Sequence, residues 1–136
     1  MKGLFIEDND VVVVEVFVTN VDDKLFANHD KEKLISDIGD KKDVVDDDID
    51  SLKFTFKVPN YKDEVSIVDG AIRSDSDDNL EIDAAAVRYE RFVTLLRDWD
   101  ITDAKDKKVP PNRENINKIN PVLAIAVMNA LDEKMA

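Results

Sequence analysis

Acidic side chains recur at alternate positions in three segments, a spacing that is typical of the start of a calcium-binding EF-hand loop. The segments are Asp46-Asp48-Asp50, Asp75-Asp77-Asn79 and Asp98-Asp100-Thr102. An EF-hand loop also needs Gly at its sixth position, for a sharp turn, and Glu at its twelfth, for bidentate coordination. Those two positions hold Ser51 and Lys57, Leu80 and Ala86, and Asp103 and Val109. The sequence therefore predicts no dedicated metal site.

The residue types that serve most often in catalysis are scarce in this chain. His29 is the single histidine and there is no cysteine, so a thiol nucleophile is absent and a zinc site would lack ligands. The glycines Gly3, Gly39 and Gly70 are too far apart to form a phosphate-binding loop. Carboxyl pairs are abundant among the 31 Asp and Glu residues, but a general acid also needs an apolar pocket that raises its pKa. We expect a non-enzymatic protein without a cofactor, in which His29 is a loop residue.

The composition is that of one folded, acidic domain. The chain has 136 residues, of which 43% are hydrophobic and 37% are charged. We expect a single domain over residues 1–136, with mainly strands and an acidic loop in residues 1–60 and mainly helices in residues 61–136. The net charge of −12 disfavours binding to nucleic acid or to an anionic membrane, because either partner normally needs a basic patch.

The sequence lacks the patterns of secretion and of membrane insertion. Residues 1–6 contain one lysine and a short apolar stretch, which is unlike a signal peptide. The longest apolar run, residues 122–131, is about half as long as a membrane-spanning helix and is interrupted by Asn129. A chain without cysteine also suits a reducing compartment. We expect a soluble protein of the cytoplasm.

Strands are predicted mainly in the first half of the chain. Residues 4–6 and 11–19 favour a leading hairpin, joined at Asp8-Asn9-Asp10. Residues 11–14 and 16–18 do not alternate with polar residues, so we expect both faces of that strand to be covered. It is either a central strand or an edge that another subunit completes. Residues 52–58 alternate with a period of two, which predicts a strand with one buried face that ends at Pro59.

Three helices are predicted before residue 100. Asp30 can cap a short helix through Ile38, with Gly39 as its stop, and residues 61–72 favour a second helix. The clearest pattern, over residues 83–99, has one apolar stripe at helical spacing. The stripe consists of Ala85, Tyr89, Phe92, Leu96 and Trp99. Arg88 lies within the apolar arc, so we expect its stem to be buried and its guanidinium to reach a carboxylate or a carbonyl. Residues 46–50 and 74–79 are predicted to be solvated acidic loops.

Two further helices are predicted after residue 111. Asn112 can cap a short helix that ends near Ile119, and Asn120 with Pro121 starts a last helix that runs to about Lys134. Residues 122–128 are apolar almost all round, which indicates either a fully buried helix or a surface for a protein partner. The predicted fold class is α+β, with a small N-terminal antiparallel sheet followed by a C-terminal helical part of three to four helices.

Residues 88–103, Arg-Tyr-Glu-Arg-Phe-Val-Thr-Leu-Leu-Arg-Asp-Trp-Asp-Ile-Thr-Asp, lead into residues 108–121, Lys-Val-Pro-Pro-Asn-Arg-Glu-Asn-Ile-Asn-Lys-Ile-Asn-Pro, and then into an apolar helix. This order of amphipathic helix, tryptophan, acidic loop, proline and capped helices resembles tailed-bacteriophage tail assembly chaperones. Residues 54–61, Phe-Thr-Phe-Lys-Val-Pro-Asn-Tyr, are similar to small phage tail and neck proteins. The resemblance covers the C-terminal two-thirds and leaves the valine-rich start unmatched. It implies a non-enzymatic protein of the host cytoplasm that keeps the tape-measure protein soluble and recruits tail-tube subunits.

Three functional hypotheses follow. The first is a tail assembly chaperone that binds its partners through the last two helices. The second is a structural component of the neck, tail or capsid of the virion, whose N-terminal strand augments the sheet of a neighbouring subunit, and which can be a homo-oligomer. The third is an acidic inhibitor of a host nuclease. The candidate protein-binding residues are Val12, Val14, Trp99, Val122, Ile125, Val127 and Met128. For Trp99, a core position and an interface anchor are both open.

Overall fold

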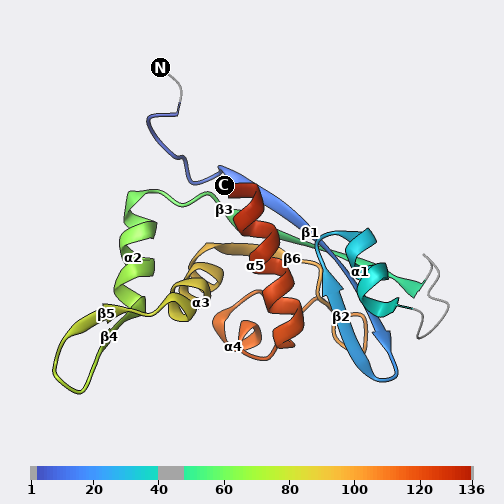
Figure 1. Cartoon of the computed structure of the whole chain (residues 1–136). Coiled ribbons are helices and arrows are strands. Elements are labelled where there is room, and N and C mark those ends of the chain that lie inside the picture. Colours follow the sequence, from blue (N-terminus) through green and yellow to red (C-terminus); the bar gives the residue numbers. More distant parts are fainter. Residues whose placement is uncertain (1–2, 40–47, 136) are drawn as a thin grey trace.

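The computed structural model describes residues 3–39 and 48–135, which form a four-stranded antiparallel sheet and five helices, most of them C-terminal (Figure 1). The sheet has the strand order β2-β1-β3-β6, and a separate hairpin pairs β4 with β5. The strands are β1 (Val11–Val21), β2 (Lys24–Asn28), β3 (Asp50–Lys57), β4 (Ile72–Ser74), β5 (Leu80–Ile82) and β6 (Leu96–Trp99). The helices are α1 (Lys31–Ile38), α2 (Tyr61–Ala71), α3 (Ala84–Leu95), α4 (Arg113–Ile116) and α5 (Pro121–Met135). The predicted α+β class is confirmed.

The first hairpin lies later in the chain than predicted. β1 pairs with β2, and the connecting residues Asp22 and Asp23 both have positive φ angles, of 52° and 63°. A two-residue turn of this kind matches the twist of the strands that it joins, and Asp tolerates it better than most residues. The predicted strand at residues 4–6 is wrong. These residues lead away from the sheet (Figure 1), because β1 takes its two neighbours from β2 and β3 instead.

The predicted helix over residues 83–99 is correct at its start and wrong at its end. Asp83 caps α3 by accepting hydrogen bonds from the amides of Ala85 and Ala86. After Leu95 the chain becomes extended and forms β6, in which Trp99 pairs with Phe54 of β3. The pairing satisfies the otherwise open edge of β3, which the helical periodicity of the sequence cannot reveal. Ala85 and Tyr89 of the predicted stripe are exposed, so the buried face of α3 is narrower than expected.

The core lies between one face of the sheet and the helices α2, α3 and α5. Val14 and Val16 of β1 and Phe54 and Phe56 of β3 point into it, as the alternation of residues 52–58 predicts. Phe92 of α3 stacks edge-on against both phenylalanines, with ring centroids 6.4 Å and 5.6 Å away. Edge-to-face pairs of this kind add to the hydrophobic stabilisation. Large aromatic side chains therefore join the sheet to α3.

The opposite face of the sheet is covered at one end only. Phe17 and Val21 of β1 pack with Leu34 and Ile38 of α1, which Asp30 caps and Gly39 ends as predicted. At the other end of the strand, Val11 and Val13 are exposed. The expectation that both faces of residues 11–18 are covered is therefore wrong at that end. The reason is the length of α1, whose eight residues reach only the second half of β1.

The remaining helices begin close to where the sequence predicts. Asn60 and Asp63 form a capping box at the start of α2, and Asn112 caps α4. α4 ends at Ile116 rather than near Ile119, because residues 117–119 form tighter turns. α5 starts at Pro121 as predicted and runs to Met135. None of the helices in the described ranges is long and apolar enough to cross a membrane. The predicted acidic loop at residues 46–50 lies partly outside the described residues.

Candidate protein-binding site

The candidate binding residues fall into two groups according to their burial. Four are buried in the core, and three are accessible to different degrees. The buried residues are Val14, Trp99, Val127 and Met128. Val12 is half-buried, whereas Val122 and Ile125 of α5 are exposed, Ile125 at 59%. Only the accessible residues can contact a partner without unfolding the domain. Among the candidate residues on helices, the ones that a partner can reach therefore lie on the outer side of α5.

Trp99 is a core residue in this fold. Its side chain is 1% exposed, its ring stacks edge-on against Phe54 at a centroid distance of 6.2 Å, and its indole N–H donates to the carbonyl of Val109 at 2.6 Å. A buried indole that is packed and hydrogen-bonded gains stability from both interactions. Trp99 thus ties the loop before α4 to the sheet.

An apolar groove lies between α3, α4 and α5. Its volume is about 590 Å³, and its lining is mostly apolar. The lining includes Phe92 of α3, Ile116 of α4, Ile119, and Ala124, Ile125 and Met128 of α5. Ile125 lies on both the groove and the open surface of α5, so it marks where a partner side chain would enter. An apolar groove between helices is a common docking surface for an amphipathic helix.

Polar contacts hold α3 against α5 at one side of the groove. The guanidinium of Arg88 donates to Asp132 and to Asn129 of α5, both at 3.1 Å. This confirms the prediction that Arg88 reaches a carboxylate. A planar guanidinium that bonds two acceptors fixes the relative position of both helices better than a single contact does.

A second set of polar contacts holds α3 against α4. The hydroxyl of Tyr89 donates to the side-chain oxygen of Asn117 at 2.6 Å. The guanidinium of Arg113 lies 5.7 Å from the centroid of the Tyr89 ring, within the range of a cation–π contact. Arg113 also forms an ion pair with Glu90 at 3.7 Å. The groove therefore has an apolar floor and a polar rim, an arrangement typical of protein interfaces.

The described residues, 3–39 and 48–135, contain no cluster of three or more His, Asp and Glu side chains that could bind a metal ion. His29 lies in the bend after β2, and its Nε2 is 2.6 Å from Glu133 of α5. This contact joins the end of β2 to the last helix.

A buried ion pair was not foreseen in the sequence. Lys57 occupies the last position of β3, and its Nζ lies 2.8 Å from Asp63 of α2 and 3.5 Å from Asp8. The hydrogen bond that Lys57 donates to the Asp63 carboxylate raises the pKa of Lys57. Burial acts to raise the pKa of Asp63, but hydrogen bonds from Lys57 and from the Asn60 amide outweigh it and lower the pKa. The pair therefore holds the start of α2 against the sheet in charged form.

Comparison with protein-family models, curated proteins and solved structures finds no match to this chain. The resemblance of residues 88–121 to tail assembly chaperones therefore stays a prediction. The groove includes two features that sequence reasoning missed. Tyr89 was placed on the inward stripe but lies on the rim, and Ile119 was placed inside a helix but follows one. The apolar surplus of residues 122–128 was the one signal that pointed to this region.

Proposed function

We propose that this protein is a non-enzymatic tail assembly chaperone of a tailed bacteriophage. In this role it holds an apolar segment of the tape-measure or tail-tube protein in the groove between α3, α4 and α5. The observation that supports the proposal most strongly is the apolar groove itself, with Ile125 exposed at its edge. Residues 88–121, which resemble the chaperone family, include most of α3 and all of α4 and lead into α5.

The size of the groove suits a transient complex. Burying a side chain such as Ile125 contributes about 1.5–3 kcal/mol, and the groove offers few such anchors. The loss of translational and rotational freedom on binding offsets much of that gain. A moderate affinity follows, which allows the partner to leave when the tail polymerises.

The proposal is tested by co-expressing the chain with the tape-measure and tail-tube proteins of the same phage. The wild-type chain is expected to keep the tape-measure protein in the soluble fraction. Ile125→Asp should abolish this effect, because it puts a charge at the entrance of the groove. Ile35→Asp is the matched control, since Ile35 is an exposed isoleucine on α1, outside the groove. Equal activity of the Ile125→Asp and wild-type chains would refute the proposal.

The exposed edge of β1 favours a second candidate, a structural component of the virion. β2 pairs only with residues 17–21 of β1, and β3 lies on the other side. The carbonyl of Asp10 accepts a hydrogen bond from the backbone amide of Val58. The even-numbered residues of β1 therefore direct their backbone N–H and C=O groups toward β3. Val11, Val13 and Glu15 direct theirs to the opposite side, where no strand among the described residues pairs with them. Such an edge is suited to strand addition by a neighbouring subunit.

Mass spectrometry of purified particles separates the two candidates. A chaperone leaves when the tail is complete, so its peptides should be missing from washed virions. A structural component stays, and its peptides should be recovered in a fixed ratio to those of the tail-tube protein. Recovery at a fixed ratio would replace the first proposal with the second.

A further inference from the structure

α2 presents a row of apolar side chains to solvent. Tyr61, Val65 and Val68 are all exposed, Tyr61 at 83%, and their spacing of four and three places them along one side of the helix. Ile72, which follows α2 directly, continues the row. The side chains of α2 that pack against the core, Ile67 and Ala71, belong to a different face. The exposed row is therefore not needed for the contact between α2 and α3.

The hairpin after α2 extends the same apolar surface. In β4 and β5, Ile72 pairs with Ile82 and Ser74 pairs with Leu80, so these four side chains share one face. Leu80 is 74% exposed, and Ile82 is exposed as well. Figure 1 shows the hairpin projecting from the body of the molecule. A two-stranded hairpin is only marginally stable by itself, which makes an uncovered apolar face notable.

These six residues form one continuous surface, named here the apolar strip. It consists of Tyr61, Val65, Val68, Ile72, Leu80 and Ile82. Tyr61, Val65, Val68 and Ile72 also line a shallow hollow of about 330 Å³ on α2. Monomeric proteins rarely leave a large contiguous apolar surface in water unless it binds something.

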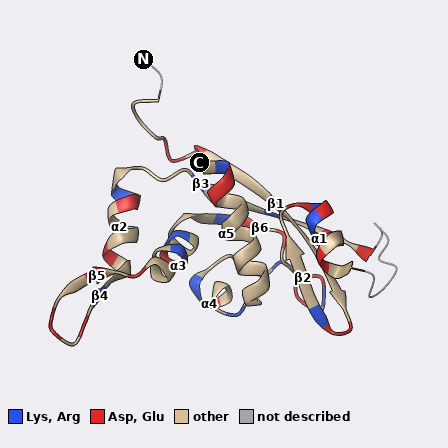
Figure 2. Ribbon diagram, in the orientation of Figure 1, with Lys and Arg blue, Asp and Glu red and all other residues tan. Residues whose placement is uncertain are grey.

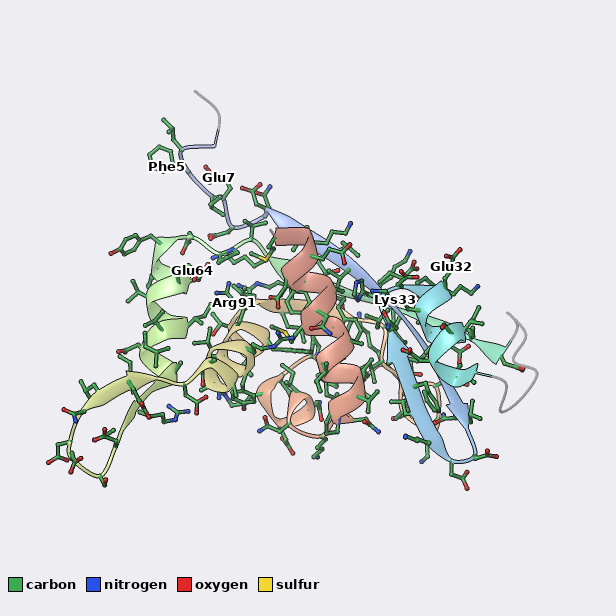
Figure 3. The ribbon with its side chains drawn as sticks, in the orientation of Figure 1. Phe5, Glu7, Glu32, Lys33, Glu64 and Arg91 are labelled. Carbon is green, nitrogen blue, oxygen red and sulfur yellow. The ribbon has the colours of Figure 1, made fainter. Side chains whose placement is uncertain are left out.

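The strip lies on a rigid support. Arg91 of α3 donates to both carboxylate oxygens of Glu64 of α2, at 3.0 Å and 3.3 Å, and Figure 3 shows the two side chains facing each other. α2 also approaches α3 closely at Gly70, where an added Cβ would lie 2.7 Å from Glu90. α2 is therefore fixed on the body with its apolar row directed outward.

The surroundings of the strip are strongly acidic. Residues 61–83 contain eight acidic side chains and only two basic ones. Figure 2 shows acidic residues at the tip of the hairpin. The two basic residues are Lys62, which is exposed, and Arg73, which donates to the carbonyls of Gly70 and Ile72. Arg91 of α3 is paired with Glu64. In the hairpin loop, hydrogen bonds from the amides of Asn79 and Asp77 lower the pKa of Asp75, so it stays charged.

We propose that the apolar strip is a docking surface for a basic amphipathic helix of another protein. Apolar side chains of that helix would pack along the row on α2, as ridges pack into grooves between helices. Lysine or arginine side chains beside them would face the acidic rim. A second copy of this chain fits less well, because it would bring the same excess of negative charge to the contact. This surface is separate from the groove of the proposed function and does not depend on it.

The proposal is tested with two synthetic peptides of about 18 residues, or about five helical turns. One presents leucines on one face and lysines on the other, and the second has glutamate in place of each lysine. Binding is measured by the fluorescence anisotropy of a dye on each peptide. The lysine peptide should bind and the glutamate peptide should not. Raising the salt concentration to about 1 M should weaken binding, because it shortens the Debye length to about 3 Å.

Three variants locate the binding site of the lysine peptide. Val65→Ser and Leu80→Ser keep the charge and remove an apolar anchor, so each should weaken binding about tenfold. Ile125→Ser removes an apolar residue from the other groove and should leave binding unchanged. Unchanged binding by the first two variants would mean that charge alone attracts the peptide, which overturns the proposal. A second result would also overturn the proposal: a wild-type chain that sediments as a dimer and a Val65→Ser variant that sediments as a monomer. A second copy of the chain would then cover the strip.

Discussion

The core beneath α3 and α5 and the arm formed by α2, β4 and β5 contain similar apolar residues in opposite surroundings. In the core, Phe54, Phe92 and Trp99 are enclosed on all sides by the sheet and the helices. On the arm, Tyr61 and Leu80 face solvent. Burial rather than residue type decides whether an apolar side chain contributes to folding. The core therefore stabilises the domain, whereas we propose that the arm and the groove bind partners.

Trp99→Ala should have the largest effect on the core. It removes a buried aromatic side chain and leaves the carbonyl of Val109 without its donor, so the free energy of unfolding should fall by about 3–5 kcal/mol. Urea denaturation followed by circular dichroism measures the change. A loss below about 1 kcal/mol would show that Trp99 is not a core anchor.

Two neighbouring positions on α5 provide a sharper version of the same test. Val127 is buried and Ile125 is exposed. A polar residue should therefore lower the free energy of unfolding much more at position 127 than at position 125. Val127→Asn should lower the free energy of unfolding by about 3 kcal/mol, because it loses apolar burial and buries an amide. Ile125→Asn should change it by less than about 0.5 kcal/mol. Equal losses in thermal and urea unfolding would contradict the assignment of the two faces.

The ion pair of Lys57 and Asp63 predicts how stability depends on pH at the junction of core and arm. The lowered pKa of Asp63 stabilises the fold above its unfolded-state pKa of about 4, and this contribution is lost as pH falls through the folded-state pKa. The raised pKa of Lys57 stabilises the fold below about pH 10. This contribution is lost as pH rises through the folded-state pKa of Lys57. The free-energy advantage of the wild type over Asp63→Asn should therefore be full near pH 7 and shrink below about pH 4. An advantage that stays constant between pH 7 and pH 3 would refute this role.

Variants of the arm should have the smallest effect on folding. Val65→Ser and Leu80→Ser change exposed side chains, so each should alter the free energy of unfolding by less than about 0.5 kcal/mol. Urea denaturation under the conditions used for Trp99→Ala gives the comparison. A loss above about 2 kcal/mol would mean that the arm packs against the body in solution.

Local signals in the sequence were enough to place most helix starts. Asp30 and Asn112 cap α1 and α4 as predicted, because a cap depends on hydrogen bonds to amides two or three residues away. The alternation of residues 52–58 identified β3 for a similar reason. Such features need no knowledge of the rest of the chain.

Features that depend on distant residues were missed. β6 continues the helical spacing of α3 through Leu96 and Trp99, and only the free edge of β3 makes that segment extended. β2 was not predicted, because its residues have no clear periodicity. Its position follows from the turn at Asp22 and Asp23, whose positive φ angles are visible only in the structure. The groove was anticipated only as a surplus of apolar residues, because the exposed side of α5 is set by tertiary packing. The apolar strip was missed since Ile72, Leu80 and Ile82 come together only in the hairpin.

The separation of folding from binding is tested most directly by two measurements on Ile125→Asp. Its free energy of unfolding is compared with that of the wild type, and so is its ability to keep the tape-measure protein soluble. We expect stability within about 0.5 kcal/mol of the wild type together with loss of the partner. A variant that stays folded and still keeps the partner soluble would contradict the assignment of this groove to partner binding.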